Sequence, residues 1–114
     1  MRSHKSLLAW QEANAVVRPV MRSSRGIRHP CVDQLQRAAL SVQLDIAEGY
    51  ALKTSKRFRN HLEIAHGSAV ETAELLELNC DLGFLPAEPI RGALAQCRRC
   101  QGLFLGLIKR LRKS

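Results

Sequence analysis

The sequence has few aromatic side chains, with Phe, Trp and Tyr together making up 4% of its 114 residues. It also lacks any run of about 18 unbroken apolar residues, which argues against a membrane-spanning helix. The N-terminal stretch has neither the apolar segment nor the small-residue cleavage site of a signal peptide, so we expect a cytoplasmic protein. The four cysteines are then expected to be reduced thiols.

Signals for β-strands are also missing, because no segment alternates polar and apolar residues and no Asn-Gly turn occurs. Hydrophobic residues nevertheless make up 46% of the chain, and most of them are Leu and Ala, which favour helices. A chain of this length can bury one hydrophobic core but not two. We therefore predict one all-α domain over residues 1–114.

Apolar residues recur at helical spacing in four segments, which we place at about residues 6–23, 32–50, 54–83 and 89–111. The second segment shows the pattern most clearly, with steps of three and four between Val32, Leu35, Ala39, Val42, Ile46 and Gly49. Pro19 is expected to kink the first helix or end it early, and Gly49 is a plausible stop for the second. The pattern predicts an antiparallel up-down-up-down four-helix bundle with short loops.

The third segment carries more apolar surface than one core-facing stripe requires. A second stripe lies roughly 120° around the helix from the first and consists of Ile64, Leu75, Leu78 and Leu82. Leu103 and Leu107 widen the apolar face of the fourth segment in the same way. This excess predicts contacts between subunits. The alternative is a central helix that touches two neighbours within one bundle.

The chain is strongly basic, with 18 Lys and Arg against 10 Asp and Glu, which gives a net charge of +8. Such a charge suits a polyanion such as RNA or DNA. Four basic residues crowd the start of the third helix, where the helix dipole is already positive, so a bound phosphate there would be favourable. Four more lie on the fourth segment. The candidate nucleic-acid-binding residues are Lys53, Lys56, Arg57, Arg59, Arg98, Arg99, Lys109 and Arg110.

The same charges allow a second interpretation, in which they only form exposed surfaces. Lys and Arg are absent between Arg59 and Arg91, whereas Asp and Glu are absent after Glu88. The third helix therefore has an acidic outer face and the fourth a basic one. These faces could attract each other within one chain or pair neighbouring subunits.

Residue patterns typical of catalysis and metal binding are missing. No HExxH, GxSxG or phosphate-binding loop occurs. Glu63 and His66 stand three residues apart, but a di-iron bundle needs two such pairs from different helices. Cys97 and Cys100 form a single CxxC pair, and Cys97 lies on the predicted core seam, which favours buried thiols. We predict no enzymatic activity, no cofactor and no metal.

One face of the second helix is polar although leucines lie within it and beside it. Because Leu44 lies inside this stripe, we expect a buried polar network rather than a solvated face, with Arg37 neutralising Asp45 or Glu48. A solvated face is the alternative. The stripe consists of Arg37, Ser41, Asp45 and Glu48.

The chain resembles the 23S rRNA intervening-sequence proteins. The resemblance is carried by the IAEGY block at residues 46–50, the IAHGS block at residues 64–68 and LGFL at residues 82–85, together with Trp10, Gln11, Arg37 and the closing GLIK at residues 106–109. Asp45 stands where the family usually has Asn. The resemblance implies a left-handed up-down-up-down bundle and a homopentameric ring, with no established enzymatic activity.

The chain is also similar to the Avd accessory proteins of diversity-generating retroelements, which share the bundle and the pentamer and bind a reverse transcriptase and nucleic acid. Our first hypothesis is a non-enzymatic oligomeric bundle that binds RNA or DNA through basic surfaces. The alternatives are an adaptor for a protein partner, such as a reverse-transcriptase accessory subunit, and a purely structural scaffold.

Overall fold

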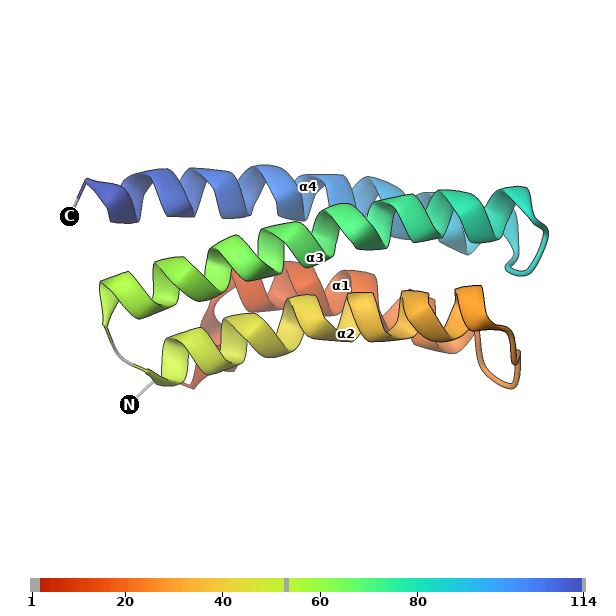
Figure 1. Ribbon diagram of the computed structural model, residues 1–114, viewed down its shortest axis with the longest axis horizontal. Coiled ribbons are helices and arrows are strands. Elements are labelled where there is room, and N and C mark those ends of the chain that lie inside the picture. The colour runs from red at the N-terminus through yellow and green to blue at the C-terminus, as the bar shows by residue number, and fades with distance from the viewer. Residues whose placement is uncertain (1–2, 53, 114) are drawn as a thin grey trace.

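The computed structural model describes residues 3–52 and 54–113, and within these ranges it contains helices and no strand. A short 3₁₀ turn, His4–Ser6, precedes four long helices (Figure 1). The prediction of an all-α fold is confirmed. The helices are α1 (Leu8–Ser23), α2 (Pro30–Ala51), α3 (Ser55–Asp81) and α4 (Ala87–Arg112).

All four helices lie along the long axis of a molecule measuring 45 × 24 × 21 Å (Figure 1). Each helix packs on the next in the chain, and α1 also packs on α4, so the four surround a common core. None of the helices in the described ranges is long and apolar enough to cross a membrane. These contacts fit the predicted helical bundle.

The chain reverses direction in short connections at the two ends of the bundle (Figure 1). The α1–α2 and α3–α4 connections meet at one end, where the rings of His29 and Phe84 stack with their centroids 3.9 Å apart. Each contains a glycine in the left-handed region, Gly26 with φ 77° and Gly83 with φ 76°, which only glycine adopts without strain. The α2–α3 connection lies at the opposite end, beside the end of α4.

Pro19 does not end α1, contrary to one of the two outcomes expected from the sequence. The helix continues past it to Ser23. Val17 and Val20, on either side of the proline, are both buried in the core. A proline inside a helix costs about 3 kcal/mol, and burial of the two valines opposes that cost by about 1.5–3 kcal/mol for each side chain.

The predicted seam residues of α2 are all buried in the core. The apolar residues that recur at helical spacing in α3 and α4 are mostly buried too, although Phe58, Leu94 and Leu111 are only partly covered. The buried residues also include Ala93, Gln96 and Cys100 of α4 and Asn79 of α3, which the spacing of apolar residues did not indicate. The Asn79 side chain reaches α2, where its Nδ2 donates to the Cys31 carbonyl oxygen at 3.1 Å.

Gly49 is not the stop of α2, because the helix continues to Ala51. The glycine is buried against α3 instead. A Cβ at this position would lie 2.6 Å from the Cβ of His61, closer than two side-chain carbons can approach. The absence of a side chain at Gly49 therefore permits the close approach of α2 to α3.

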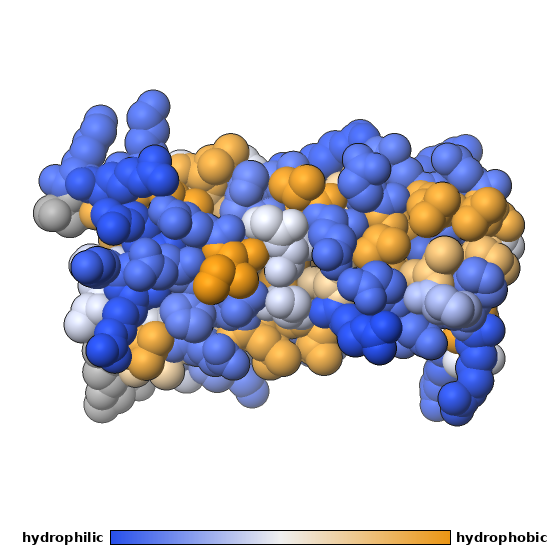
Figure 2. Space-filling model, in the orientation of Figure 1, coloured by the Kyte–Doolittle hydropathy of each residue, from blue (hydrophilic) through white to orange (hydrophobic). Residues whose placement is uncertain are grey.

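The second apolar stripe of α3 is largely uncovered. Ile64 is 54% exposed, Leu78 42% and Leu82 53%, and only Leu75 packs against the core. Of these four residues, only Leu75 is covered by a neighbouring helix of the same bundle. The alternative of a second neighbour within one bundle does not explain Ile64, Leu78 and Leu82. Leu103 and Leu107 of α4, by contrast, pack against the core of their own chain. Figure 2 shows apolar side chains interrupting the polar surface over α2 and α3.

Candidate nucleic-acid interface

The start of α3 presents basic side chains beside a capped helix N-terminus. Thr54 caps the helix, since its Oγ1 accepts from the backbone N–H of Arg57 at 3.2 Å. Lys56 and Arg57 are exposed in the first turn, and Arg59 is half-buried. The first turn contains no acidic residue that would offset them. Lys53, which was predicted to belong to this cluster, lies outside the described residues.

The end of α4 carries the second basic cluster, with Lys109, Arg110 and Arg112 in its last turn. Because α4 ends at the end of the bundle where α3 begins, the fold brings the two clusters to one end (Figure 1). Figure 2 shows hydrophilic side chains gathered and protruding at this end of the molecule. We call this region the basic end and define it by Lys56, Arg57, Arg59, Lys109 and Arg110.

Arg98 and Arg99 do not belong to the basic end. Lys109 lies ten positions after Arg99 on α4, which corresponds to about 15 Å along the helix. Both arginines also have partners nearby. Arg98 donates to Glu77 Oε1 at 2.8 Å, and Arg99 Nε donates to Gln96 Oε1 at 3.1 Å. The fold therefore brings together three of the described candidates on α3 and two on α4, the residues of the basic end. Arg98 and Arg99 lie apart from them.

The acidic face of α3 and the basic face of α4 form ion pairs within one chain. Glu77 pairs with Arg98 at 2.8 Å, and Glu63 pairs with Arg112 at 3.1 Å. Each of these side chains is at least 44% exposed, so such a pair contributes only about 0.2–1 kcal/mol to stability. Of the two interpretations left open by the sequence, attraction within one chain accounts for these pairs.

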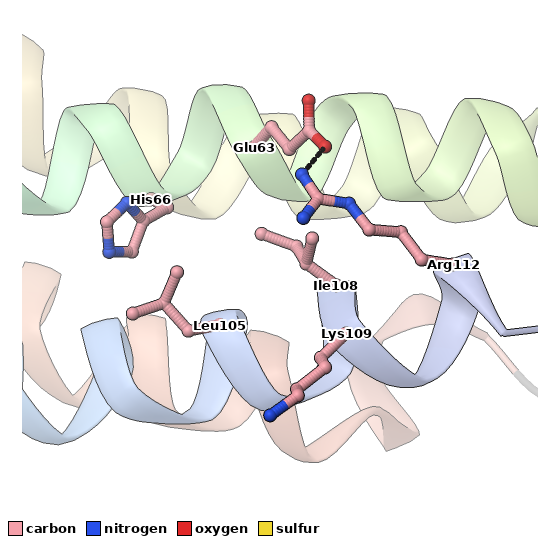
Figure 3. Close-up of a pocket in the computed structure, with 6 residues that line it drawn as sticks. All are labelled: Glu63, His66, Leu105, Ile108, Lys109 and Arg112. Carbon is pink, nitrogen blue, oxygen red and sulfur yellow. Dashed lines mark hydrogen bonds and ion pairs between the residues drawn. The ribbon is translucent and has the colours of Figure 1, made fainter.

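A shallow groove of about 360 Å³ lies between α3 and α4 beside the basic end (Figure 3). Leu105 and Ile108 of α4 form its apolar part, Arg112 reaches across to α3, and Lys109 lines it from α4 with its side chain directed away from α3. Glu63 and His66 line the α3 side, and the Glu63 carboxylate is bound by Arg112. The groove thus adds a partly neutralised surface next to the basic end.

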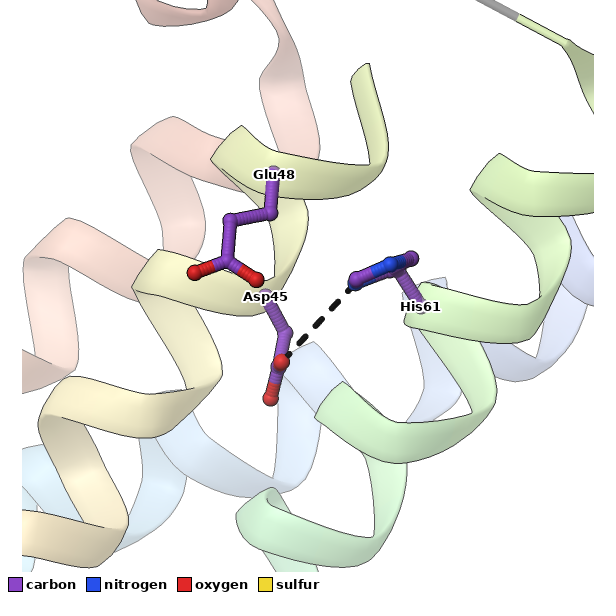
Figure 4. Close-up of side chains that lie close together, drawn as sticks. All are labelled: Asp45, Glu48 and His61. Carbon is purple, nitrogen blue, oxygen red and sulfur yellow. Dashed lines mark ion pairs between the residues drawn. The ribbon is translucent and has the colours of Figure 1, made fainter. Parts of the chain in front are cut away.

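The polar stripe of α2 forms contacts that differ from the predicted network. Arg37 is exposed and donates to Gln34 Oε1 at 3.3 Å, so its expected pairing with Asp45 or Glu48 is wrong. The reason is local, since Gln34 lies one turn before Arg37 on the same helix face. Asp45 instead accepts from Ser41 Oγ at 3.1 Å and faces His61 of α3 (Figure 4).

His61 was missed by the sequence analysis although a signal for it existed. It stands seven residues before Ser68 and therefore shares its face of α3. The Ser68 hydroxyl lies 3.2 Å from that of Ser41 on α2. The helical period thus placed His61 and Ser68 together, but only the packing of α3 on α2 placed both opposite the polar stripe.

Among the residues that the structure describes, burial raises the pKa of three side chains, those of Asp45, Cys97 and Cys100. Burial raises the pKa of Asp45 above its ordinary value, and the hydrogen bond from Ser41 and the charge of His61 oppose that shift. Burial also raises the pKa of Cys97 to about 11 and that of Cys100 to about 12. Both thiols are therefore protonated at neutral pH, as expected for core cysteines rather than for reactive or metal-binding ones.

The fold and the surface define a class: a small all-α protein of four packed helices, with basic side chains gathered where α3 begins and α4 ends. The chain belongs to the 23S rRNA-intervening sequence protein family, whose sequence model matches residues 5–106. The resemblance found in the sequence is thereby confirmed. Neither this family nor the solved structure described next points to a catalytic activity.

The fold is similar to a crystal structure from Bacteroides thetaiotaomicron VPI-5482, described as a protein of unknown function from the S23 ribosomal protein family. The two chains superpose with a TM-score of 0.77 at 21% sequence identity, over 90% of this chain and 99% of the other. No curated protein matches the sequence.

Proposed function

We propose that this chain is a non-enzymatic, oligomeric bundle protein of the cytoplasm that binds the backbone of RNA or DNA through its basic end. The main support for the proposal is that α3 begins and α4 ends at the same end of the bundle. Basic side chains from two distant parts of the sequence therefore lie at one end. The left-handed up-down-up-down sense expected from the family is part of the same proposal.

The electrostatics of the α3 start favour an anionic ligand. Backbone N–H groups at a helix N-terminus point outward and bear partial positive charge. Lys56 and Arg57 add full charges at the same place, which is unfavourable unless an anion binds. A phosphate bound there would interact with both the side chains and the first turn of the helix.

The aromatic side chains support binding to the backbone rather than to bases. Trp10 packs against the core, with its ring edge-on to His4 at a centroid distance of 5.6 Å. Tyr50 is half-buried and lies edge-on to Phe58. Base stacking on exposed aromatic rings is the usual means of binding single strands. We therefore expect binding to structured, double-helical nucleic acid with little sequence preference.

A salt titration of binding to a structured RNA tests this function. Five contacts at the basic end predict a slope of log K against log salt of about −4. The double variant Lys56→Ala/Arg57→Ala should weaken binding and make the slope less steep by about 2.

The matched control is Arg22→Ala/Arg25→Ala, which removes the same charge at the opposite end of the bundle, where both side chains are exposed. The control should leave the slope nearly unchanged. Undetectable binding at low salt, or an equal loss in the two double variants, would refute the proposal.

Self-association is supported by the uncovered side chains Ile64, Leu78 and Leu82 on one face of α3. An apolar patch on a helix face often marks a contact with another protein molecule. The family resemblance favours a homopentamer, and light scattering on the purified protein measures the mass directly. The variant Leu78→Glu should lower that mass, whereas Leu8→Glu on α1, a similarly exposed leucine, should not.

The second candidate function is an adaptor that presents the same α3 face to a different protein, and the third is a scaffold without a ligand. A monomeric wild-type protein at micromolar concentration would exclude the ring and favour the adaptor. An oligomer that binds no RNA or DNA at low salt would favour the scaffold.

A further inference from the structure

Three side chains with metal-binding atoms meet where α2 packs on α3. Asp45 and Glu48 stand three residues apart on α2, and His61 faces them from α3 (Figure 4). One carboxylate oxygen from each acid and one imidazole nitrogen lie within 4.8 Å of one another. Two helices thus supply a nitrogen and two oxygens to a single small region.

One ring nitrogen of His61 forms no hydrogen bond within the described part of the chain. This atom, Nδ1, is shielded from solvent. Asp45 Oδ1 lies 3.9 Å from this nitrogen, which is too far for a hydrogen bond. A buried polar atom without a partner destabilises the folded chain. An ion between Nδ1 and Oδ1 would satisfy both atoms.

The surrounding residues hold two of these side chains in place. Ser41 donates to Asp45 Oδ2 at 3.1 Å, which fixes the carboxylate and leaves Oδ1 turned toward His61. Gly49 of α2 lies against the Cβ of His61, so the histidine has little room to move away. Hydrogen bonds that orient metal ligands are typical of metal sites in proteins.

We propose that Asp45, Glu48 and His61 bind a divalent first-row transition-metal ion of the Zn²⁺ type. This site goes beyond the proposed nucleic-acid binding and does not depend on it. One imidazole and two carboxylates form a donor set suited to such ions. Mg²⁺ and Ca²⁺ fit less well, because both prefer oxygen ligands alone.

The required rearrangement is small. Metal–ligand bonds of about 2.0–2.2 Å place the ligands of a tetrahedral site about 3.4 Å apart. Asp45 Oδ1 and His61 Nδ1, now 3.9 Å apart, need to approach by about half an ångström. The Glu48 side chain is exposed and can rotate to supply the third ligand. The fourth position would be open to water.

Calorimetric titration of the full chain with Zn²⁺ tests the proposal. Because Cys31 and Cys80 are only half-buried, the titration uses the Cys31→Ser/Cys80→Ser background to remove thiol binding. We expect one ion per chain, and an affinity at least about tenfold lower in Asp45→Asn and in His61→Gln. The matched control is His66→Gln, a half-buried histidine on the same helix, which should bind as tightly as the background protein.

Equal binding in all four proteins would identify an adventitious ion and overturn the proposal, as would the absence of binding. A second measurement needs no substitution at the proposed ligands. Addition of paramagnetic Co²⁺ to the background protein should broaden the ring proton signals of His61 before those of His4, His29 and His66. Equal broadening of all four histidines would also overturn the proposal.

Discussion

The substitution Gly49→Ala tests the close approach of α2 to α3. The added Cβ would lie 2.6 Å from His61 Cβ, 3.2 Å from His61 Cγ and 3.1 Å from Phe58 Cδ1. Rotation about χ1 does not move a Cβ, so the shortest contact is relieved only when the two helix backbones move apart. Overpacking of this kind costs about 1–3 kcal/mol. We place it near the upper end of that range because the opposing atom is rigid.

Alanine also has a higher helix propensity than glycine, by about 1 kcal/mol in a helix interior. The net prediction for Gly49→Ala is therefore a loss of about 1–2 kcal/mol in the free energy of unfolding, the difference between the two effects. Gly106→Ala in α4 is the matched control, since nothing lies within 4 Å of its added Cβ. It should gain about 0.5–1 kcal/mol.

Urea denaturation followed by circular dichroism measures both changes through the transition midpoint. If Gly49→Ala were at least as stable as the wild type, the helices would not be in the close contact described above. The explanation of Gly49 as a packing residue would then fail. A parallel gain in Gly49→Ala and Gly106→Ala would show that propensity alone decides both positions.

Three further predictions follow from single groups. Thr54→Ala removes the N-cap of α3 and should lower the free energy of unfolding, measured by urea denaturation, by about 1 kcal/mol. Thr54→Ser should keep most of this stability, because its hydroxyl can still cap the helix. Because burial raises the pKa of Asp45 in the folded protein, ionised Asp45 destabilises the fold above its ordinary pKa of 3.8. Asp45→Asn should then be more stable than wild type at neutral pH, and this advantage should shrink as the pH falls through the folded and then the ordinary pKa. An advantage that grew toward acid pH would contradict that sign. The raised pKa values of Cys97 and Cys100 predict that iodoacetamide leaves both thiols unmodified in the native protein at neutral pH, as mass spectrometry of labelled peptides can check.

Periodicity along a single helix was enough to predict most of the core. Val32, Leu35 and Ile46 are buried because their spacing keeps them on one face of α2, whatever that face contacts. The cap at Thr54 could be found in the same way, because a cap depends on residues within one turn of it. The family could also be identified from short sequence blocks, and its sequence model matches residues 5–106.

Contacts between helices could not be predicted in this way. Arg37 bonds to Gln34 rather than to an acid of its own stripe, and His61 rather than Arg37 faces Asp45. Glycine often ends a helix, but Gly49 instead allows close packing against His61, twelve positions further along the chain. The contacts of His61 with Asp45 and with Gly49 depend on the axial register of α2 against α3.

The sequence by itself determined the four helices, the face that each one buries and membership of the protein family. These features follow from the order of residues along the chain. Only the tertiary structure decided that the basic start of α3 and the basic end of α4 share one end of the bundle. It also decided that Asp45, Glu48 and His61, whose side chains carry atoms able to ligate a metal, meet between α2 and α3. The physical reason is that register and rotation between helices are set by the packing of the whole core, to which every buried side chain contributes.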